Sequence, residues 1–291
     1  MSTDKVVDTK IFDSVETAWC PGCGNFSIQA ALKQALAELG LLPHEVVITS
    51  GIGQAAKMPH YVRTNGFNGL HGRALPPAFG IHVANKNLKV IVSTGDGDSF
   101  GEGGNHVIHN MRRNIDIAHF VHDNQIYGLT KGQASPTTSR GHKTSVQVEG
   151  VINKPLNPIA LSIVSGATFV ARAYAGNRKH LVSIMKEAIQ HRGYAMVDIM
   201  QPCVTFNKVN TYEWFNERAY MISNDHDRTD RLAALEMAFE WEDTDKVAFG
   251  IFYQVNEPTY IDNIPKLRDG KALVDRKPDM EKVKRFIEEF I

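Results

Sequence analysis

Short apolar runs and segments with helical spacing alternate along most of this chain. Helical spacing predicts helices over about residues 28–39, where the pattern stops at Gly40, and over 101–113 and 178–192. β-branched runs predict strands over residues 46–49, 90–92, 115–121, 167–174 and 195–200. Strands that alternate with helices in this way predict an α/β fold, with a mostly parallel sheet flanked by helices.

The character of the chain changes twice, which predicts three parts. Residues 1–18 are polar and are expected to form an N-terminal arm. Residues 19–203 carry the alternating elements and form the predicted α/β domain. Residues 204–291 form a C-terminal extension, which we expect to wrap the core or contact a partner. Within this extension, the sequence predicts helices over 228–241 and 273–291 and an edge strand over 247–255.

Composition and charge exclude several classes of protein. Lys+Arg and Asp+Glu both number 32, so no global basic field indicates nucleic-acid binding. No apolar run approaches the roughly 18 residues of a membrane helix, and the first residues lack the apolar core of a signal peptide. We therefore expect a cytoplasmic protein without a membrane or nucleic-acid partner. A net charge of zero gives little protection against association, which favours a chain that lives in a complex.

Candidate chemistry gathers where two predicted strands end. One strand runs into Gly95-Asp96-Gly97-Asp98, and the next ends just before Asn124. Because the strands of a βαβ unit lie parallel, their carboxyl ends meet at the sheet edge where ligands bind. Asp96, Asn124 and the backbone carbonyl of Ile126 offer the oxygen ligands that Mg²⁺ prefers, and the glycines allow close approach to a diphosphate. This edge is therefore a predicted site for Mg²⁺ and a diphosphate.

Other motifs fit this stretch less well. An EF-hand loop that starts at Asp96 would need Asp or Asn where Phe100 stands and Glu where Val107 stands. A dinucleotide fingerprint would need Gly in place of Phe100, and the sequence contains no phosphate-binding G-x-x-x-x-G-K-[ST] motif. The remaining alternative is a Gly/Asp-rich turn that binds no ligand.

The three cysteines suggest a second site. Cys20 and Cys23 form a C-x-x-C pair before a predicted helix, whose N–H groups and dipole suit an anionic cluster. No second pair completes a zinc site, and a polar arm precedes the pair where a thioredoxin-like dithiol would follow a strand. Cys203 can supply a third thiolate to an iron–sulfur cluster, although an isolated cysteine is more often part of a core. These residues alone leave the alternatives open.

The segments GDGDSFGEGGNHVIHNMRRNIDI and YGLTKGQASPT resemble the β subunits of 2-oxoacid:ferredoxin oxidoreductases, and the match covers about residues 19–206. The resemblance implies a thiamine diphosphate-binding fold in which Asp96, Asn124 and Ile126 hold Mg²⁺. The wider set that it implies for cofactor binding is Gly22, Ile52, Gly53, His71, Gly72, Arg73, Gly95, Gly97, Asp98, Tyr127, Gly128, Leu129 and Thr130.

The same resemblance implies a 4Fe-4S cluster on Cys20, Cys23 and Cys203. The family's fourth cysteine stands in a Ser-Gly-Ile-Gly-Cys motif, which here ends in Gln54. Glutamine is a poor iron ligand beside thiolate. A non-cysteine fourth ligand, a three-iron or labile form, and no cluster at all are the alternatives. We expect the cluster, because three scattered matches without one would be a coincidence.

The implied reaction is the oxidative decarboxylation of a 2-oxo acid to acyl-CoA and CO₂, with electrons passing through the cluster to ferredoxin, or the reverse carboxylation. No glutamate of the matched motifs can activate the coenzyme, so no catalytic residue is assigned here. The family takes this glutamate from an α subunit, so we expect an αβ or α₂β₂ assembly and an inactive isolated chain.

The substrate is expected to be 2-oxoglutarate, because Lys57 and Lys131 can pair with a second carboxylate. A pyruvate-specific member of the family is one alternative. A non-redox thiamine diphosphate decarboxylase or synthase is another. A non-enzymatic iron–sulfur or zinc module is the third.

Overall fold

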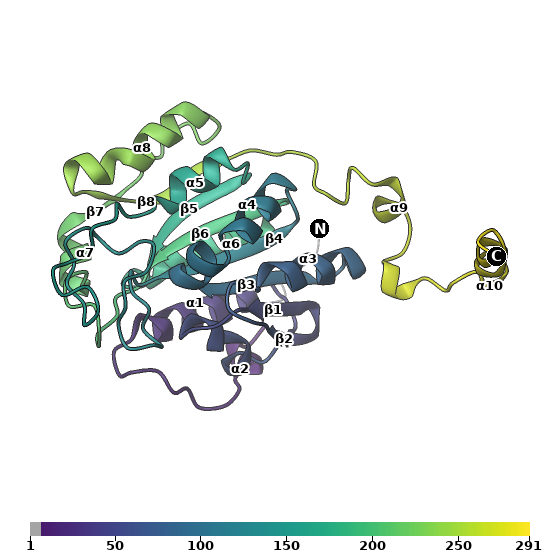
Figure 1. The fold of residues 1–291 in the computed structure, drawn as a ribbon, viewed down its shortest axis with the longest axis horizontal. Helices are drawn as coiled ribbons and strands as arrows, with labels where there is room; N and C mark the ends of the chain where they lie inside the picture. Colours follow the sequence, from purple (N-terminus) through teal and green to yellow (C-terminus); the bar gives the residue numbers. More distant parts are fainter. Residues whose placement is uncertain (1–6) are drawn as a thin grey trace.

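An eight-stranded sheet forms the centre of the fold in the computed structural model, which describes residues 7–291 (Figure 1). The strand order is β2-β1-β3-β4-β6-β5-β8-β7, and the pairing of β5 with β8 is the antiparallel one. The strands are β1 (Val46–Ser50), β2 (Asn65–Asn68), β3 (Lys89–Gly95), β4 (Ile117–Asp123), β5 (Phe169–Tyr174), β6 (Tyr194–Met200), β7 (Ala219–Met221) and β8 (Val247–Gln254). The prediction of a mostly parallel sheet is confirmed.

Helices cover both faces of this sheet. The helices of the described chain are α1 (Gly24–Glu38), α2 (Met58–Tyr61), α3 (Leu75–Ala84), α4 (Gly104–Arg112), α5 (Pro158–Val164), α6 (Arg178–Gln190), α7 (Tyr212–Arg218), α8 (Arg231–Thr244), α9 (Pro265–Arg268) and α10 (Met280–Glu288), of which α10 does not contact the sheet. The helices α1 and α6 share one apolar cluster, whereas α3, α4, α5 and α8 belong to another. Successive strand residues alternate between the clusters, as Val47 and Ile48 do, because side chains of a strand point to opposite faces.

Burial on both faces explains the β-branched runs that predicted five of the strands. Every residue of β1, β4, β5 and β6 is buried, as is usual for parallel strands between two helical layers. The strand β2 was missed, because its sequence Asn-Gly-Phe-Asn is exposed and carries no apolar pattern. It forms by pairing with β1.

Two predictions for the last third of the chain are wrong. Residues 247–255 were expected to form an edge strand, but β8 lies between β5 and β7. The helix predicted over 273–291 begins only at Met280. Pro278 disfavours a helical residue before it, and the side chain of Asp279 accepts the N–H groups of Glu281 and Lys282 as a helix cap.

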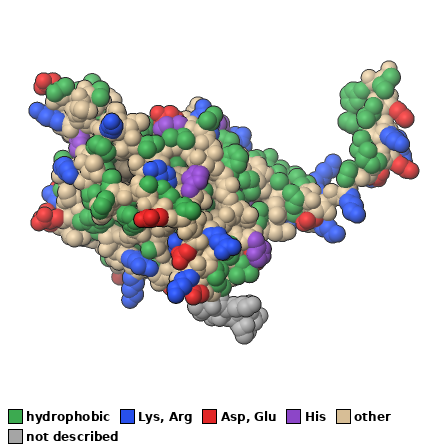
Figure 2. Space-filling model, turned by 90° about the horizontal axis from the view of Figure 1, so that it is seen from below, with side chains coloured by type: hydrophobic (Ala, Val, Ile, Leu, Met, Phe, Trp, Pro, Cys, Tyr) green, Lys and Arg blue, Asp and Glu red, His purple; other side chains and the backbone are tan. Residues whose placement is uncertain are grey.

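The two ends of the described chain differ in their packing. The first six residues of the predicted arm lie outside the described residues, but Phe12 is fully buried in the cluster that contains α1. At the other end, Lys86 donates to the carbonyls of Leu267 and Arg268 in α9, whereas α10 extends away from the body (Figures 1 and 2). Every residue of α10 is exposed, including Val283, Phe286 and Ile287. From residue 7 onward, no helix combines the length and apolarity needed to span a membrane.

Candidate functional site

The carboxyl ends of β1, β3 and β4 surround a hollow of about 460 Å³. We call this the glycine-rich hollow. Besides Gln54 and Ala55, it is lined by Ile52, Gly53, His71, Gly95, Asp96, Gly97, Asp98, Asn124, Ile126, Tyr127, Gly128, Leu129 and Thr130. All of these thirteen belong to the predicted cofactor-binding set, so the fold gathers most of that set around one cavity.

Asp96 and Asn124 lie in this hollow because β3 and β4 are adjacent and parallel. Their register pairs Gly95 with His122, so the residues that follow each strand are neighbours. Asp96 is only 1% exposed. The side-chain oxygen of Asn124 accepts the N–H of Ile126 at 3.0 Å, which fixes the turn that presents this amide. One carboxylate and one amide oxygen, with backbone carbonyls nearby, form a donor set that suits Mg²⁺.

A cluster of buried acids favours a cation at this position. Asp96, Asp123 and Asp198 are all buried, whereas Arg172, which binds Asp198 at 3.0 Å, is the buried cation beside them. Burial raises the pKa of Asp96 to about 6. Burial, followed by the nearby Asp96 and Asp198, also raises the pKa of Asp123 well above its usual range. A divalent cation would offset the surplus of negative charge.

Thr137 links two of these acids and was not predicted. Its hydroxyl lies 2.7 Å from a carboxylate oxygen of Asp96 and 2.8 Å from one of Asp123. A hydroxyl has one proton and donates to one acceptor at a time, so the second carboxylate is left without this donor. The sequence signal for Asp123 was an acid at a strand end, and Thr137 is the last residue of the segment YGLTKGQASPT, but no role was predicted for either side chain.

Asp98 holds two turns against the hollow. One of its carboxylate oxygens accepts the N–H of Ile52 at 3.1 Å and that of Gly72 at 2.7 Å. The Nδ1 atom of His71 lies 2.9 Å from the same oxygen. A Cβ atom at Gly51 would lie 2.2 Å from the other oxygen of Asp98. The turn at residues 51–53 therefore approaches the end of β3 as closely as only glycine allows.

A π-helical turn over Gly97–Glu102 separates β3 from α4, so the helix predicted from residue 101 begins at Gly104. Such turns are rare and are frequent at functional sites. The ring of Tyr127 packs on Gly97, where an added Cβ would lie 2.2 Å from a ring carbon. The hydroxyl of Tyr127 donates to Glu102 at 3.2 Å.

A second pocket of about 380 Å³ adjoins the first. We call it the cysteine pocket, and it is lined by Trp19, Cys20, Cys23, Gln54, Asn124, Gly128, Gln201, Cys203, Val204, Thr205 and Phe206. Three of these residues, Gln54, Asn124 and Gly128, also line the glycine-rich hollow. The fold therefore brings the three predicted cluster cysteines together, although 180 positions separate Cys23 from Cys203.

Electrostatics at the cysteines fits a shared positive ligand. Burial raises the pKa of the Cys23 thiol, and the neighbouring Cys203 and Cys20 raise it further. Within residues 7–291, no three His, Cys, Asp or Glu side chains are arranged to hold a single metal ion. An iron–sulfur cluster differs from a single ion, because each of its irons takes its own thiolate and the thiolates need not meet at one point.

Five residues predicted to bind cofactor or substrate do not line the glycine-rich hollow. Gly22 lies in the turn before α1 and its carbonyl accepts the hydroxyl of Tyr212 at 3.4 Å. Gly72 binds Asp98, and Arg73 donates to the carbonyl of Glu102 at 3.0 Å. The two lysines predicted to bind substrate are also absent from the wall of the hollow. Lys57 is half-buried before α2, and Lys131 is exposed with a φ of 78°.

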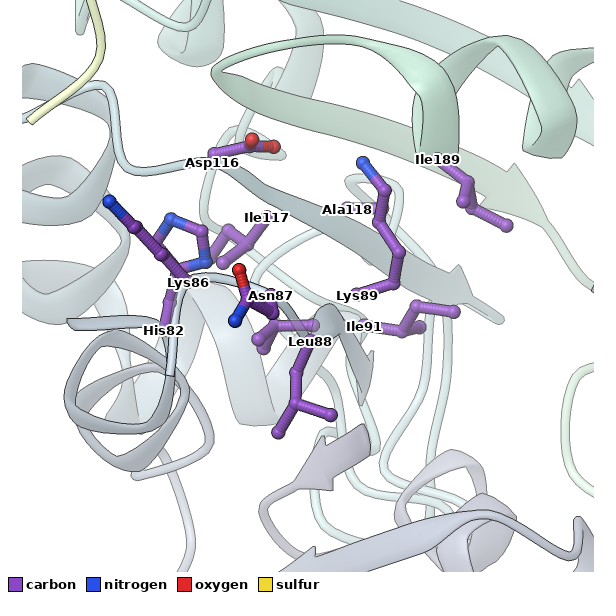
Figure 3. Close-up of a pocket in the computed structure, with 11 residues that line it drawn as sticks. His82, Lys86, Asn87, Leu88, Lys89, Ile91, Asp116, Ile117, Ala118 and Ile189 are labelled. Atoms are coloured by element: carbon purple, nitrogen blue, oxygen red, sulfur yellow. The ribbon is translucent and has the colours of Figure 1, made fainter. Parts of the chain in front are cut away.

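The opposite edge of the sheet also has a hollow, which Figure 3 shows. Lys89 begins β3 there, and Asp116 stands just before β4. Burial lowers the pKa of His82 in its wall, and the charge of Asp116 works against this shift. Charges of both signs meet at this edge, and no glycine lines it. It offers no donor set comparable with Asp96 and Asn124.

Comparisons with known proteins agree with the geometry of the carboxyl edge. The family "Thiamine pyrophosphate enzyme, C-terminal TPP binding domain" matches residues 47–199. The family of the C-terminal part of the pyruvate ferredoxin oxidoreductase beta subunit matches residues 203–269. The chain is 46% identical over 273 residues to the 2-oxoacid:ferredoxin oxidoreductase subunit beta of Saccharolobus solfataricus, with 85% of this chain and 88% of that one covered.

Two further relatives carry 2-oxoglutarate in their names. The 2-oxoglutarate synthase subunit KorB of Methanocaldococcus jannaschii is 34% identical over 258 residues, which cover 88% of this chain and 94% of that one. A solved structure, the 2-oxoglutarate:ferredoxin oxidoreductase from Magnetococcus marinus with 2-oxoglutarate, coenzyme A and succinyl-CoA bound, has a TM-score of 0.90 and 37% identity. The match covers 96% of both chains.

Proposed function

We propose that this chain, which belongs to the family of β subunits of the 2-oxoacid:ferredoxin oxidoreductases, is a subunit of an enzyme whose substrate is 2-oxoglutarate. The family predicted from the sequence is confirmed, and so are oxidoreductase activity and the thiamine diphosphate-binding fold. The proposed reaction converts the 2-oxo acid and coenzyme A to acyl-CoA and CO₂, with electrons going to ferredoxin. The reverse reaction fixes CO₂.

The observation that carries this proposal is that Asp96 and Asn124 both line the glycine-rich hollow, at the ends of two adjacent parallel strands. We propose that Asp96, Asn124 and the carbonyl of Ile126 hold Mg²⁺, which binds the diphosphate of the coenzyme. Bound there, thiamine diphosphate supplies the carbanion chemistry by which a 2-oxo acid loses CO₂. The chain's own part is to bind and orient: Asp98 fixes the turns at Ile52 and Gly72, and Tyr127 packs on Gly97.

The cysteine pocket is the proposed site of the 4Fe-4S cluster, on Cys20, Cys23 and Cys203. Support comes from the raised pKa of the Cys23 thiol, which burial causes first and the neighbouring Cys203 and Cys20 increase, because bound iron would stabilise the thiolates. Support also comes from the three residues that line both cavities, because they keep a cluster and a coenzyme adjacent. Adjacent groups suit the transfer of electrons from substrate to cluster.

A partner α subunit is proposed to complete the site. Over the described part of the chain, no glutamate lines the glycine-rich hollow, so the group that activates the coenzyme is expected from that partner. Lys57 and Lys131 remain the candidates for the distal carboxylate of 2-oxoglutarate. A pyruvate-specific enzyme is the second candidate, because the family matched at residues 203–269 is named for pyruvate.

An anaerobic assay of the complex tests the function. Reduction of a viologen dye is measured with 2-oxoglutarate and with pyruvate, each with coenzyme A and thiamine diphosphate, using this chain alone and with its α subunit. We expect turnover only with both subunits and a higher kcat/KM for 2-oxoglutarate. A higher value for pyruvate would reassign the substrate, and CO₂ release without dye reduction would indicate a non-redox decarboxylase.

A further inference from the structure

We infer that the carboxamide of Gln54 faces the fourth iron of the cluster, so that this iron lacks a thiolate and is exchangeable. The inference rests on the proposed function, because it takes the cluster to be bound by the cysteine pocket. It concerns the one position at which this chain departs from the four-cysteine pattern, and it predicts a property that a four-cysteine cluster would not have.

The backbone of Gln54 is fixed to the segment that carries the first two cysteines. Its carbonyl accepts the indole N–H of Trp19 at 2.9 Å, and Trp19 directly precedes Cys20. Gly53, with a φ of 130°, allows the turn that leads from β1 into this position. The side chain of Gln54 therefore starts from a defined place in the wall that also contains Cys23 and Cys203.

The side-chain oxygens of two glutamines in this wall have no hydrogen-bond partner. The Oε1 atoms of Gln54 and Gln201 are both buried and unpaired. Buried polar atoms usually have partners, so these two oxygens point to a missing group. Gln201 is already committed to a cluster ligand, since its Nε2 donates to the sulfur of Cys23 at 3.4 Å. Gln54 has no side-chain bond among the residues from 7 to 291, and is free to face the remaining corner.

Ligand chemistry explains why this corner would be labile. A carboxamide oxygen is a neutral, hard donor, whereas thiolate is the soft, charged ligand that holds iron in clusters. Asn124 lines the same pocket, but its oxygen accepts the N–H of Ile126 and is the one proposed to hold Mg²⁺, so it is not available to the cluster. The iron opposite Gln54 would thus be bound by cluster sulfides and by oxygen, and it would leave first on oxidation.

The expected reaction balances with a one-electron oxidant such as ferricyanide. The 4Fe-4S cluster in its 2+ state gives a 3Fe-4S cluster in its 1+ state, one Fe²⁺ and one electron. The electron reduces ferricyanide to ferrocyanide, and the Fe²⁺ goes into solution. Added Fe²⁺ and a thiol reductant reverse the change.

The test uses the anaerobically purified complex of both subunits, treated with one equivalent of ferricyanide and freed of small ions. Iron and acid-labile sulfide are measured per complex, and EPR is recorded at liquid-helium temperature. For the wild type we expect the loss of about one iron in four from this cluster, with sulfide retained and the paramagnetic signal of an oxidised three-iron cluster. Fe²⁺ and dithiothreitol should restore the iron.

Two variants sharpen the test. Gln54→Cys supplies a fourth thiolate and should keep all four irons and suppress the three-iron signal. Gln190→Cys is the matched control, because Gln190 is exposed at the end of α6 just before β6 begins, at the sheet edge opposite the cysteine pocket. This variant should behave like the wild type.

The outcomes separate this inference from the function that it deepens. A wild-type cluster that keeps all four irons under ferricyanide, with no difference from Gln54→Cys, would overturn the role of Gln54 and leave the enzyme's function intact. A complex with neither iron nor sulfide in this subunit would overturn both the cluster and the inference. Thiamine diphosphate binding and decarboxylation in that same complex would show that the coenzyme site survives without it.

Discussion

Both edges of the sheet carry charged residues but use them differently. At the amino edge, Lys89 and Asp116 place opposite charges beside one hollow (Figure 3). At the carboxyl edge, Asp96, Asp123 and Asp198 are buried with Arg172 as the counter-ion, and glycine turns approach the strand ends. The difference teaches that buried acids in excess of buried cations, more than the presence of a cavity, distinguish the edge proposed to bind the coenzyme.

Removal of the carboxylate of Asp96 should give the largest difference between the edges. Asp96→Ala takes away the charged oxygen proposed for Mg²⁺, so we expect thiamine diphosphate affinity to fall more than about 100-fold, beyond the usual effect of an outer-shell change. Isothermal titration of the complex with the coenzyme and Mg²⁺ measures this. Asp116→Ala is the control at the amino edge and should leave the affinity unchanged. Equal losses in the two variants would refute the comparison.

Glycine substitutions should separate the edges by the sign of their effect on stability. Gly51→Ala places a Cβ 2.2 Å from Asp98, so we expect a loss of about 2 kcal/mol in the free energy of unfolding. Gly80→Ala is the control, because Gly80 is exposed in α3 and no atom lies within 4 Å of its added Cβ. Helix propensity predicts a gain of about 0.5–1 kcal/mol there. Denaturant titration of both variants decides, and a gain at Gly51 would contradict the close approach.

Two lysines test whether charge at the carboxyl edge selects the substrate. Lys131→Ala should raise the apparent KM for 2-oxoglutarate by about tenfold, the equivalent of about 1.4 kcal/mol, and change that for pyruvate far less. The reason is that pyruvate has no distal carboxylate to pair. Lys89→Ala at the amino edge should change neither value. If Lys131→Ala affects both substrates alike, the lysine has no part in substrate choice.

The smallest expected effect concerns the pH dependence of stability beneath the site. Burial, followed by the nearby His122, lowers the pKa of His119 to about 3. The unfolded chain takes up this proton near its ordinary pKa of about 6.5, so the folded state loses stability as pH falls from about 6.5 towards 3. Each such histidine contributes a slope of up to about 1.4 kcal/mol per pH unit in that window.

His119→Gln isolates this contribution. The free energy of unfolding is measured by denaturant titration between pH 7.5 and about 4.5, for the wild type and the variant. The variant starts from a lower stability, because the ring of His119 contacts the hydroxyls of Thr94 and Tyr194. Its slope below pH 6.5 should nevertheless be shallower. Parallel curves would mean that His119 does not stay neutral in the folded state.

Much of the carboxyl edge could be predicted from the sequence, because the right-handed βαβ connection brings the ends of successive parallel strands next to each other. Asp96 and Asn124 each follow a buried strand, and the rules for parallel βαβ units place such residues side by side. The same reasoning could not find Thr137, which reaches Asp96 from a loop of irregular structure. Nor could it pair Asp198 with Arg172, which lie on different strands and whose contact depends on the strand order.

The limits of prediction in the last third of the chain have a similar cause. β8 has the composition of a strand, but its place inside the sheet depends on β7, which has three residues and no pattern of its own. The cysteine pocket is an intermediate case. The C-x-x-C spacing is visible in the sequence, and the family resemblance adds Cys203 and Gln54 to it, but the single pocket that these residues line depends on the folded sheet.

The projecting helix α10 has a consequence for how the chain behaves outside its complex. Nine residues are too few for a helix to persist in water by its own propensity, and nothing in the described body shields its apolar side chains. The helix therefore needs contact with another surface to remain folded. In dilute solution this segment should fray and be cut early by proteases. Resistance of the peptide bonds near Met280 to proteolysis would therefore report that the chain is assembled with a partner.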